Sequence, residues 1–271
     1  MAEKRAMPNY PIQSVSRALS LLLRLRDQPT LSVSEASDYL GVSRSTAHRS
    51  LAMLVQHDFV RQDARTKLYE AGPALLQIGL AAVSRLDIRS VAQPYLHTLA
   101  ELTHETVHLV MLSGHDVLFL DGVESDRAVR NGLRIGSMVP AHTTAAGKCV
   151  LATLSSQRLR ALYPDDELET LTGRSIRTFA DLERELAAVR GRGYATNDEE
   201  SESGLRAVAA SVSDGTAVLR VMPALTIGGP MDRMTPERME ELGGIVVRHA
   251  SMLRDELMRG ERHEPAQPAT G

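Results

Sequence analysis

Two short helices joined by a glycine turn constrain this chain more than any other feature of its sequence. Ser32 is followed three residues later by Glu35, the capping box that begins a helix, and Gly41 supplies the turn that ends it. Ser43 can then cap a further helix over residues 44–58. A pair of capped helices joined by so short a turn predicts a helix–turn–helix.

The flanking segments predict the winged form of that motif. A helix over 14–26 precedes the pair, and its apolar residues cover nearly half of the helix circumference, whereas one core needs a stripe of roughly 100°. The excess predicts a second apolar contact, with another subunit. After the pair, β-like runs at 59–62 and 67–70 are joined by "DART" and stopped by Gly72-Pro73. This order of elements indicates a winged helix–turn–helix that binds DNA.

The helix over 44–58 carries small and polar side chains opposite its apolar face. Small residues let a helix enter the major groove closely, and an arginine there can read a guanine edge or grip a phosphate. Backbone N–H groups at the helix start also favour phosphate, and two basic residues of the hairpin are candidates for backbone or minor-groove contact. The predicted DNA-contacting residues are Ser43, Arg44, Ser45, Thr46, His48, Arg49, Arg65 and Lys67.

Charge is distributed unevenly along the chain, whose net charge is −3. Residues 1–73 hold 10 Lys or Arg and 7 Asp or Glu, and the remainder holds 21 and 27. The mild split favours a basic N-terminal module that meets nucleic acid and an acidic remainder that does not.

The remaining sequence predicts a second, α+β domain, since 271 residues are long for one domain. Helical patterning continues from residue 74 to about 103. Predicted strands follow at 106–112, 116–123, near 126–131, 194–198, 205–213 and 216–227, the last pair turning at Asp214-Gly215. Predicted helices begin at 145, at 179 after a Thr178 cap, and at Thr235-Pro236.

We therefore expect four segments and a fold of the α+β class with a mostly antiparallel sheet in the second domain. They are a winged helix–turn–helix over 11–73, a linker helix over 74–90, an α+β domain over 91–258 and a disordered tail over 259–271. The N-terminus lacks the apolar run of a signal peptide, and the densest apolar segment, "ALSLLLRL", is too short to span a bilayer. A cytoplasmic protein without membrane association is expected.

Residues 104–108 match H-E-x-x-H, the pattern of zinc hydrolase helices, through His104, Glu105 and His108. That chemistry needs both imidazoles on one helical face. The residues that follow are β-branched and apolar, and in a strand residues four apart are separated by about 13 Å. We predict that the pattern straddles a helix end and a strand. A zinc hydrolase remains the alternative hypothesis, which metal analysis of the purified protein would decide.

Other patterns also suggest chemistry that their context disfavours. The run before Gly147-Lys148 has His142 where a phosphate-binding loop needs glycine, and Cys149 where it needs a hydroxyl. Cys149 is the only cysteine, which excludes multi-thiolate zinc, and we expect it to be buried. A solvated loop is the interpretation of the acidic cluster Asp198, Glu199, Glu200 and Glu202. No catalytic residue, metal or cofactor is predicted.

Many segments resemble the isocitrate-lyase-regulator (IclR) family of bacterial transcription factors. They include "LSVSEASDYLGVSRSTAHRSLAMLVQHDFV", "ETVHLVMLSGHDVLFLDGVES", "VPAHTTAAGKCVLA", "GRGYATNDEESESGLRAVAASV" and "ALTIGGP", in family order over roughly 11–255. The resemblance implies a winged helix–turn–helix, a linker helix and a GAF-like effector-binding domain. It also implies a homodimer, often a dimer of dimers, that binds double-stranded operator DNA. Such a protein most often represses transcription, and activation is the alternative.

The resemblance further implies an effector pocket. Family members that bind small 2-oxo acids tend to have two serines where this chain has Thr226 and Gly228, and Pro223 lies in the same predicted strand. We therefore expect either an organic acid or an aromatic or apolar metabolite as effector. A protein-binding scaffold is a further hypothesis. The effector-binding residues implied are Ala145, Ala146, Asn197, Leu205, Ala207, Thr226 and Gly228.

Overall fold

The computed structural model describes residues 12–84, 88–213 and 222–261. The chain divides into two compact units at Leu86, within the segment predicted as a linker helix. Among the described residues, no helix is long and apolar enough to cross a membrane.

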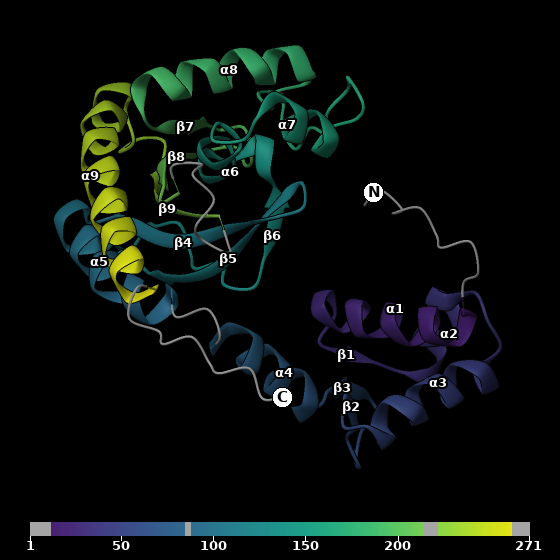
Figure 1. The fold of residues 1–271 in the computed structure, drawn as a ribbon. Coiled ribbons are helices and arrows are strands. Elements are labelled where there is room, and N and C mark those ends of the chain that lie inside the picture. The colour runs from purple at the N-terminus through teal and green to yellow at the C-terminus, as the bar shows by residue number, and fades with distance from the viewer. Residues whose placement is uncertain (1–11, 85–87, 214–221, 262–271) are drawn as a thin grey trace, which may run out of the picture. The chain divides into compact units, whose positions relative to one another are not determined.

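The N-terminal unit is a winged helix–turn–helix (Figure 1). The predicted caps are present: Ser32 and Glu35 form the capping box, and Gly41 ends its helix in the left-handed conformation with φ 63°. Leu21, Leu51 and other apolar side chains from the first three helices fill the core. Its elements are α1 (Gln13–Asp27), β1 (Thr30–Leu31), α2 (Val33–Leu40), α3 (Arg44–Gln56), β2 (Val60–Gln62), β3 (Tyr69–Ala71) and α4 (Pro73–Ser84).

A two-residue strand, β1, was not predicted from the sequence. It pairs antiparallel with β3, so the sheet order is β1-β3-β2. Leu31 of β1 is fully buried. Two residues are too few to show an alternating pattern, so no local pattern indicates this strand. It forms because its leucine completes the core of the unit.

The C-terminal unit is built on a six-stranded sheet in the order β6-β5-β4-β9-β8-β7, with every described pairing antiparallel. Helices α5 and α9 pack against each other and the sheet, α6 also packs on the sheet, and α8 contacts α6 (Figure 1). The elements are α5 (Ile88–Thr103), β4 (Thr106–Ser113), β5 (Asp116–Val123), β6 (Met138–Pro140), η1 (Ala141–Thr143), α6 (Ala145–Leu151), α7 (Ser156–Leu162), α8 (Phe179–Arg192), β7 (Ala195–Asp198), β8 (Leu205–Ser211), β9 (Pro223–Pro230) and α9 (Pro236–Glu261).

The strand predicted near 126–131 is wrong. Residues 124–137 form no strand, and they expose Val129, Leu133 and Ile135 to solvent. Residues 126–131, DRAVRN, pair with no strand in the part of the chain that the structure describes. Helix α7 was not predicted, and α9 extends to Glu261, into the expected tail. The Asp214-Gly215 turn and residues 262–271 lie outside the described residues, whereas β9 begins at Pro223.

Candidate ligand pocket and nucleic-acid interface

The exposed face of α3 carries most of the residues predicted to contact DNA. Ser45, His48 and Arg49 are exposed, as expected for residues opposite the buried Ala47, Leu51 and Leu54. Ser43 acts as the cap of α3, accepting a hydrogen bond from the backbone N–H of Thr46. Arg44 donates to the Ser34 hydroxyl of α2 at 3.1 Å, which ties the two helices together.

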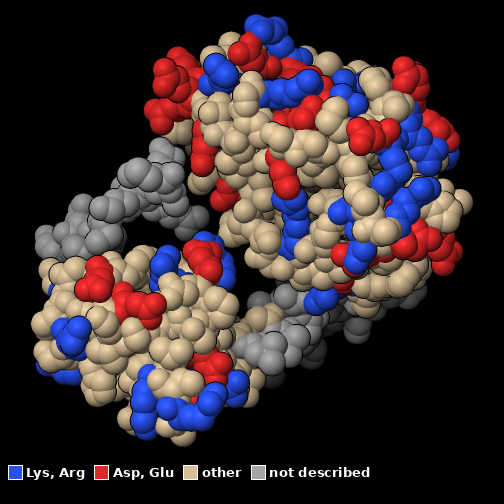
Figure 2. All heavy atoms as spheres, turned by 180° about the vertical axis from the view of Figure 1, so that it is seen from behind, with Lys and Arg blue, Asp and Glu red and all other residues tan. Residues whose placement is uncertain are grey.

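The hairpin presents Arg65 and Lys67, both exposed. Asp63 shapes its turn, since one carboxylate oxygen accepts from the backbone N–H groups of Arg65 and Thr66 at 3.0 and 2.6 Å. Arg61, which the sequence did not single out, is also exposed and pairs with Glu70 of the neighbouring strand at 2.9 Å. In Figure 2, Lys and Arg side chains gather along one edge of this unit, whereas both signs intermix over the C-terminal unit.

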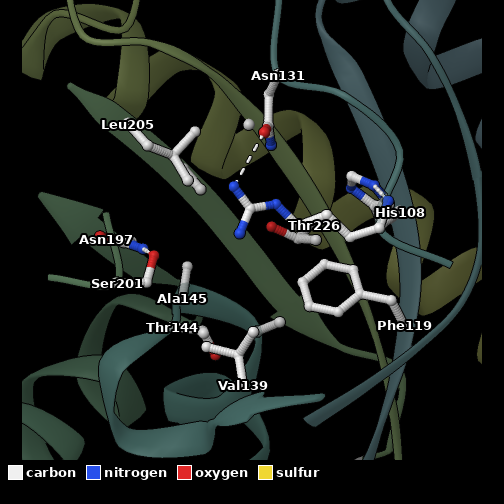
Figure 3. Close-up of a pocket in the computed structure, with 14 residues that line it drawn as sticks. His108, Phe119, Asn131, Val139, Thr144, Ala145, Asn197, Ser201, Leu205 and Thr226 are labelled. Atoms are coloured by element: carbon white, nitrogen blue, oxygen red, sulfur yellow. Dashed lines mark hydrogen bonds between the residues drawn. The ribbon is translucent and has the colours of Figure 1, made fainter. Parts of the chain in front are cut away.

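A cavity lies between the sheet and α6 in the C-terminal unit (Figure 3). It has about 40 Å³ of free space, enough for a few water molecules. The structure brings all seven residues implied as effector-binding around it, from α6, β7, β8 and β9. Seven more residues line it: His108, Phe119, Asn131, Arg134, Val139, Thr144 and Ser201.

Strand register and a hydrogen bond between near neighbours explain why two of these seven residues, His108 and Ser201, lie at the cavity. His108 pairs directly with Thr226 across β4 and β9, so the two face the same side of the sheet. Ser201 accepts a hydrogen bond from the Asn197 amide at 2.6 Å. Asn131 and Arg134 come from the segment between β5 and β6, where Asn131 falls in the strand predicted near 126–131 and Arg134 follows it. No sequence signal placed either residue at the cavity.

The start of α6 forms one wall of the cavity. Thr144 caps the helix, accepting from the Gly147 N–H at 2.9 Å, and the adjoining Ala145 and Ala146 are buried. The close approach of α6 to η1 requires a glycine. A Cβ on Gly147 would lie 2.0 Å from the carbonyl oxygen of Ala141.

The acidic segment after β7 is not a solvated loop at every position, so that prediction is wrong for Glu200. Its carboxylate is buried and accepts two hydrogen bonds from the Lys148 ammonium, at 2.5 and 2.7 Å. Burial raises the pKa of Glu200, and the neighbouring Lys148 opposes that rise. Asn197 in turn accepts from the Glu200 N–H at 2.8 Å, so the ion pair positions a cavity residue.

The H-E-x-x-H residues lie on different elements. His104 is exposed, at the junction between α5 and β4, with φ +56°. Glu105 is buried and forms a bidentate pair with Arg233, at 2.6 and 2.7 Å. His108 lies within β4 and lines the cavity. The pattern straddles a helix-to-strand junction as predicted, and its glutamate is used in an ion pair.

His108 is buried and makes an edge-to-face contact with Phe119, the ring centroids 5.0 Å apart. Burial, and secondarily Arg134, lowers its pKa from 6.5 to about 4. The neutral ring then accepts a hydrogen bond at Nε2 from the backbone N–H of Arg134, at 3.3 Å. His108 therefore anchors the loop that carries Arg134.

We expect His108 to make the stability of the C-terminal unit depend on pH. Between pH 6.5 and about 4 the unfolded chain binds a proton at this residue that the folded chain does not, so stability falls as pH falls through this window. The contribution is roughly 2–3 kcal/mol between pH 7.5 and 4.5. Urea unfolding of the wild type and His108→Gln at both pH values measures it. Equal losses for the two proteins would contradict the prediction.

Comparisons with known proteins cover both units. Residues 14–64 match the family model described as the IclR helix-turn-helix domain, and residues 80–254 match that of the bacterial transcriptional regulator IclR C-terminal domain. The chain is 31% identical over 242 residues to the transcriptional repressor IclR of Escherichia coli strain K12, covering 88% of each protein.

Two solved structures are similar throughout. The Thermotoga maritima IclR structure has 28% identity and a TM-score of 0.71, covering 91% of this chain and 99% of that one. An IclR homolog from Microbacterium hydrocarbonoxydans, complexed with 4-hydroxybenzoate, has 21% identity and a TM-score of 0.76, with the same coverage. The second likeness concerns the fold alone.

Proposed function

Because this chain belongs to the IclR family of bacterial transcriptional regulators, we propose that it represses transcription under the control of a small-molecule effector. In this proposal residues 11–73 bind double-stranded operator DNA, and residues 74–90 form the linker between the two domains. Residues 91–258 bind the effector, which is an organic acid or an aromatic or apolar metabolite. The observation that carries the proposal is the cavity surrounded by residues from α6, β7, β8 and β9, in a chain whose other unit is a helix–turn–helix.

An effector can act only through its different affinity for the DNA-binding and DNA-releasing states of the protein. The Escherichia coli relative is named a transcriptional repressor, which supports repression as the mode of control proposed for this chain. The Microbacterium complex shows that a protein of this fold accommodates an aromatic acid. We propose a cytoplasmic regulator without catalytic activity, since the two histidines of the zinc pattern lie on different elements.

We propose that the protein works as a homodimer, with a dimer of dimers as a further assembly. Helix α1 supports this proposal because its apolar arc is only half used by its own core. Leu21 and Leu25 are buried, whereas an opposite stripe is exposed by 51–67%. A second copy would bury that stripe. The stripe consists of Ile12, Val15, Leu19 and Leu23.

Replacing Arg49 with alanine is expected to weaken operator binding by about 10- to 100-fold, corresponding to roughly 1–3 kcal/mol for one arginine that contacts a base edge. The measurement is fluorescence anisotropy with a duplex of the intergenic region beside the gene, at several salt concentrations. The control is Arg184→Ala, which removes an exposed positive charge on α8.

The salt dependence separates this expectation from a general charge effect. Wild-type affinity is expected to fall steeply with salt, as counterions are released from phosphates. Lys67→Ala is expected to reduce the salt slope by about one. Wild-type-like affinity in Arg49→Ala, or binding indifferent to salt, would count against the proposed DNA contact.

A further inference from the structure

Arg134 is the one formally charged side chain among the 14 residues that line the cavity at neutral pH. Its guanidinium donates to the Asn131 side-chain oxygen at 3.4 Å, the dashed line in Figure 3. It also forms an ion pair with Glu202, on the acidic segment between β7 and β8. Glu202 does not line the cavity, and its side chain is 55% exposed.

Two contacts hold the backbone on either side of this guanidinium. The N–H of Arg134 donates to His108 of β4, and the carbonyl oxygen of Asn131 accepts from the Thr106 hydroxyl at 2.5 Å. The loop is therefore fixed to the sheet close to the base of the Arg134 side chain. By contrast, the partner residue Glu202 follows the lining residue Ser201 in the chain and does not itself line the cavity.

The other lining groups set the kind of molecule that the cavity can hold. Phe119, Val139 and Leu205 provide apolar walls, and neutral hydrogen-bonding groups come from Asn197 and Thr226. One cation among neutral and apolar groups matches one anionic group on an apolar body. A second charge on the ligand would be buried without a partner, which is costly.

Resting on the proposed function of this cavity, we propose that it binds a compact monocarboxylate with an apolar or aromatic body, whose carboxylate pairs with Arg134 in place of Glu202. Glu202 is thus an internal competitor that holds the guanidinium while the cavity is empty. With about 40 Å³ of free space, the cavity admits such a ligand only when lining side chains move. Exchange of one carboxylate for another at Arg134 couples ligand entry to release of the segment that carries Glu202.

The competition predicts that neutralising the Glu202 side chain increases the affinity of the cavity for carboxylate ligands. An exposed ion pair contributes up to about 1 kcal/mol, so Glu202→Gln is expected to bind carboxylates roughly 2- to 5-fold more tightly. Arg134→Gln is expected to lose at least about 10-fold. Glu124→Gln is the matched control, since it removes a negative charge that pairs with Arg130, and neither of these two residues lines the cavity.

The experiment uses the full chain and paired probes: benzoate with benzamide, isobutyrate with isobutyramide, and 2-oxobutanoate with 2-oxobutanamide. Each pair differs in charge and little in shape, and thermal shift followed by calorimetry gives the affinities. Binding of acids in preference to amides, strengthened in Glu202→Gln and lost in Arg134→Gln, is the expected result. The inference is overturned if amides bind as well as acids, if either variant leaves acid affinity unchanged, or if no acid binds even Glu202→Gln.

Operator release, measured in parallel, separates this inference from the proposed function. If the acids bind as expected but leave operator affinity unchanged, the proposed control of DNA binding fails and the assignment of Arg134 stands. If neutral amides release the operator, the proposed function stands and the monocarboxylate assignment fails.

Discussion

Replacing Lys148 with methionine is expected to destabilise the C-terminal unit by roughly 3–5 kcal/mol, because it leaves a buried carboxylate without its partner. The side chains of Lys148 and Glu200 are only 2% and 11% exposed, and the ammonium approaches both carboxylate oxygens. Glu185, whose carboxylate lies 3.9 Å from the Lys148 ammonium, is an anion and cannot replace that ammonium beside Glu200. Denaturant unfolding monitored by circular dichroism measures the loss.

The destabilisation in Lys148→Met is expected to be larger at pH 8 than at pH 5. Burial already raises the pKa of Glu200, and removal of the ammonium raises it further, so the orphaned carboxyl can bind a proton at the lower pH. When folding raises the pKa of a group, the folded protein becomes less stable as pH rises above the pKa that the group has in the unfolded chain.

A double variant distinguishes an orphaned charge from loss of side-chain volume. Lys148→Met combined with Glu200→Gln removes both charges and is expected to lie within about 2 kcal/mol of the wild type. If the double variant is no more stable than Lys148→Met, the ion pair is not the reason for the loss. This comparison also remains informative if the single variant fails to fold.

Replacing Gly147 with alanine is expected to cost at least about 3 kcal/mol, a loss that only severe backbone overlap would produce for one methyl group. The added Cβ would lie 2.0 and 2.4 Å from the carbonyl oxygen and Cα of Ala141. Since these are backbone atoms, α6 must move away from η1. The methyl group would therefore also displace Ala145 and Ala146 at the cavity wall.

Gly191→Ala is the matched control for this substitution. Gly191 lies in α8, and no heavy atom would be within 4 Å of its added Cβ. Alanine there is expected to stabilise the helix by up to about 1 kcal/mol. Thermal unfolding of both variants provides the test. A Gly147→Ala protein as stable as Gly191→Ala would show that η1 and α6 separate at little cost.

Local signals explain why much of the fold could be predicted. The caps at Ser32, Ser43 and Thr178 each act over three residues, so the sequence carries the whole signal. The β-branched and apolar run of β4 is likewise a signal that its own residues carry. Gly147-Lys148 is a contrasting case, because its resemblance to a phosphate loop came from packing needs: a close helix approach and a buried ion pair.

Seven of the 14 lining residues were not predicted from the sequence, because contacts between distant segments bring them to the cavity. Arg134 lies 26 residues from His108 and 68 from Glu202 along the chain, and no local period encodes such distances. Glu200 was misassigned for the same reason, since an acidic run indicates solvent unless a buried cation faces it. Lys148, 52 residues earlier, is that cation.

The strand order has a consequence for biosynthesis. Neighbouring central strands β4 and β9 come from opposite ends of the C-terminal unit, with Thr106 paired to Gly228 and Glu105 bound to Arg233. A ribosome must therefore translate almost all of this unit before its sheet can close, because β5, β6, β7 and β8 precede the strand that joins them. The winged helix–turn–helix, whose strand pairings span 40 residues or fewer, can be complete far earlier. The nascent chain would thus acquire its DNA-binding unit before the domain that controls it.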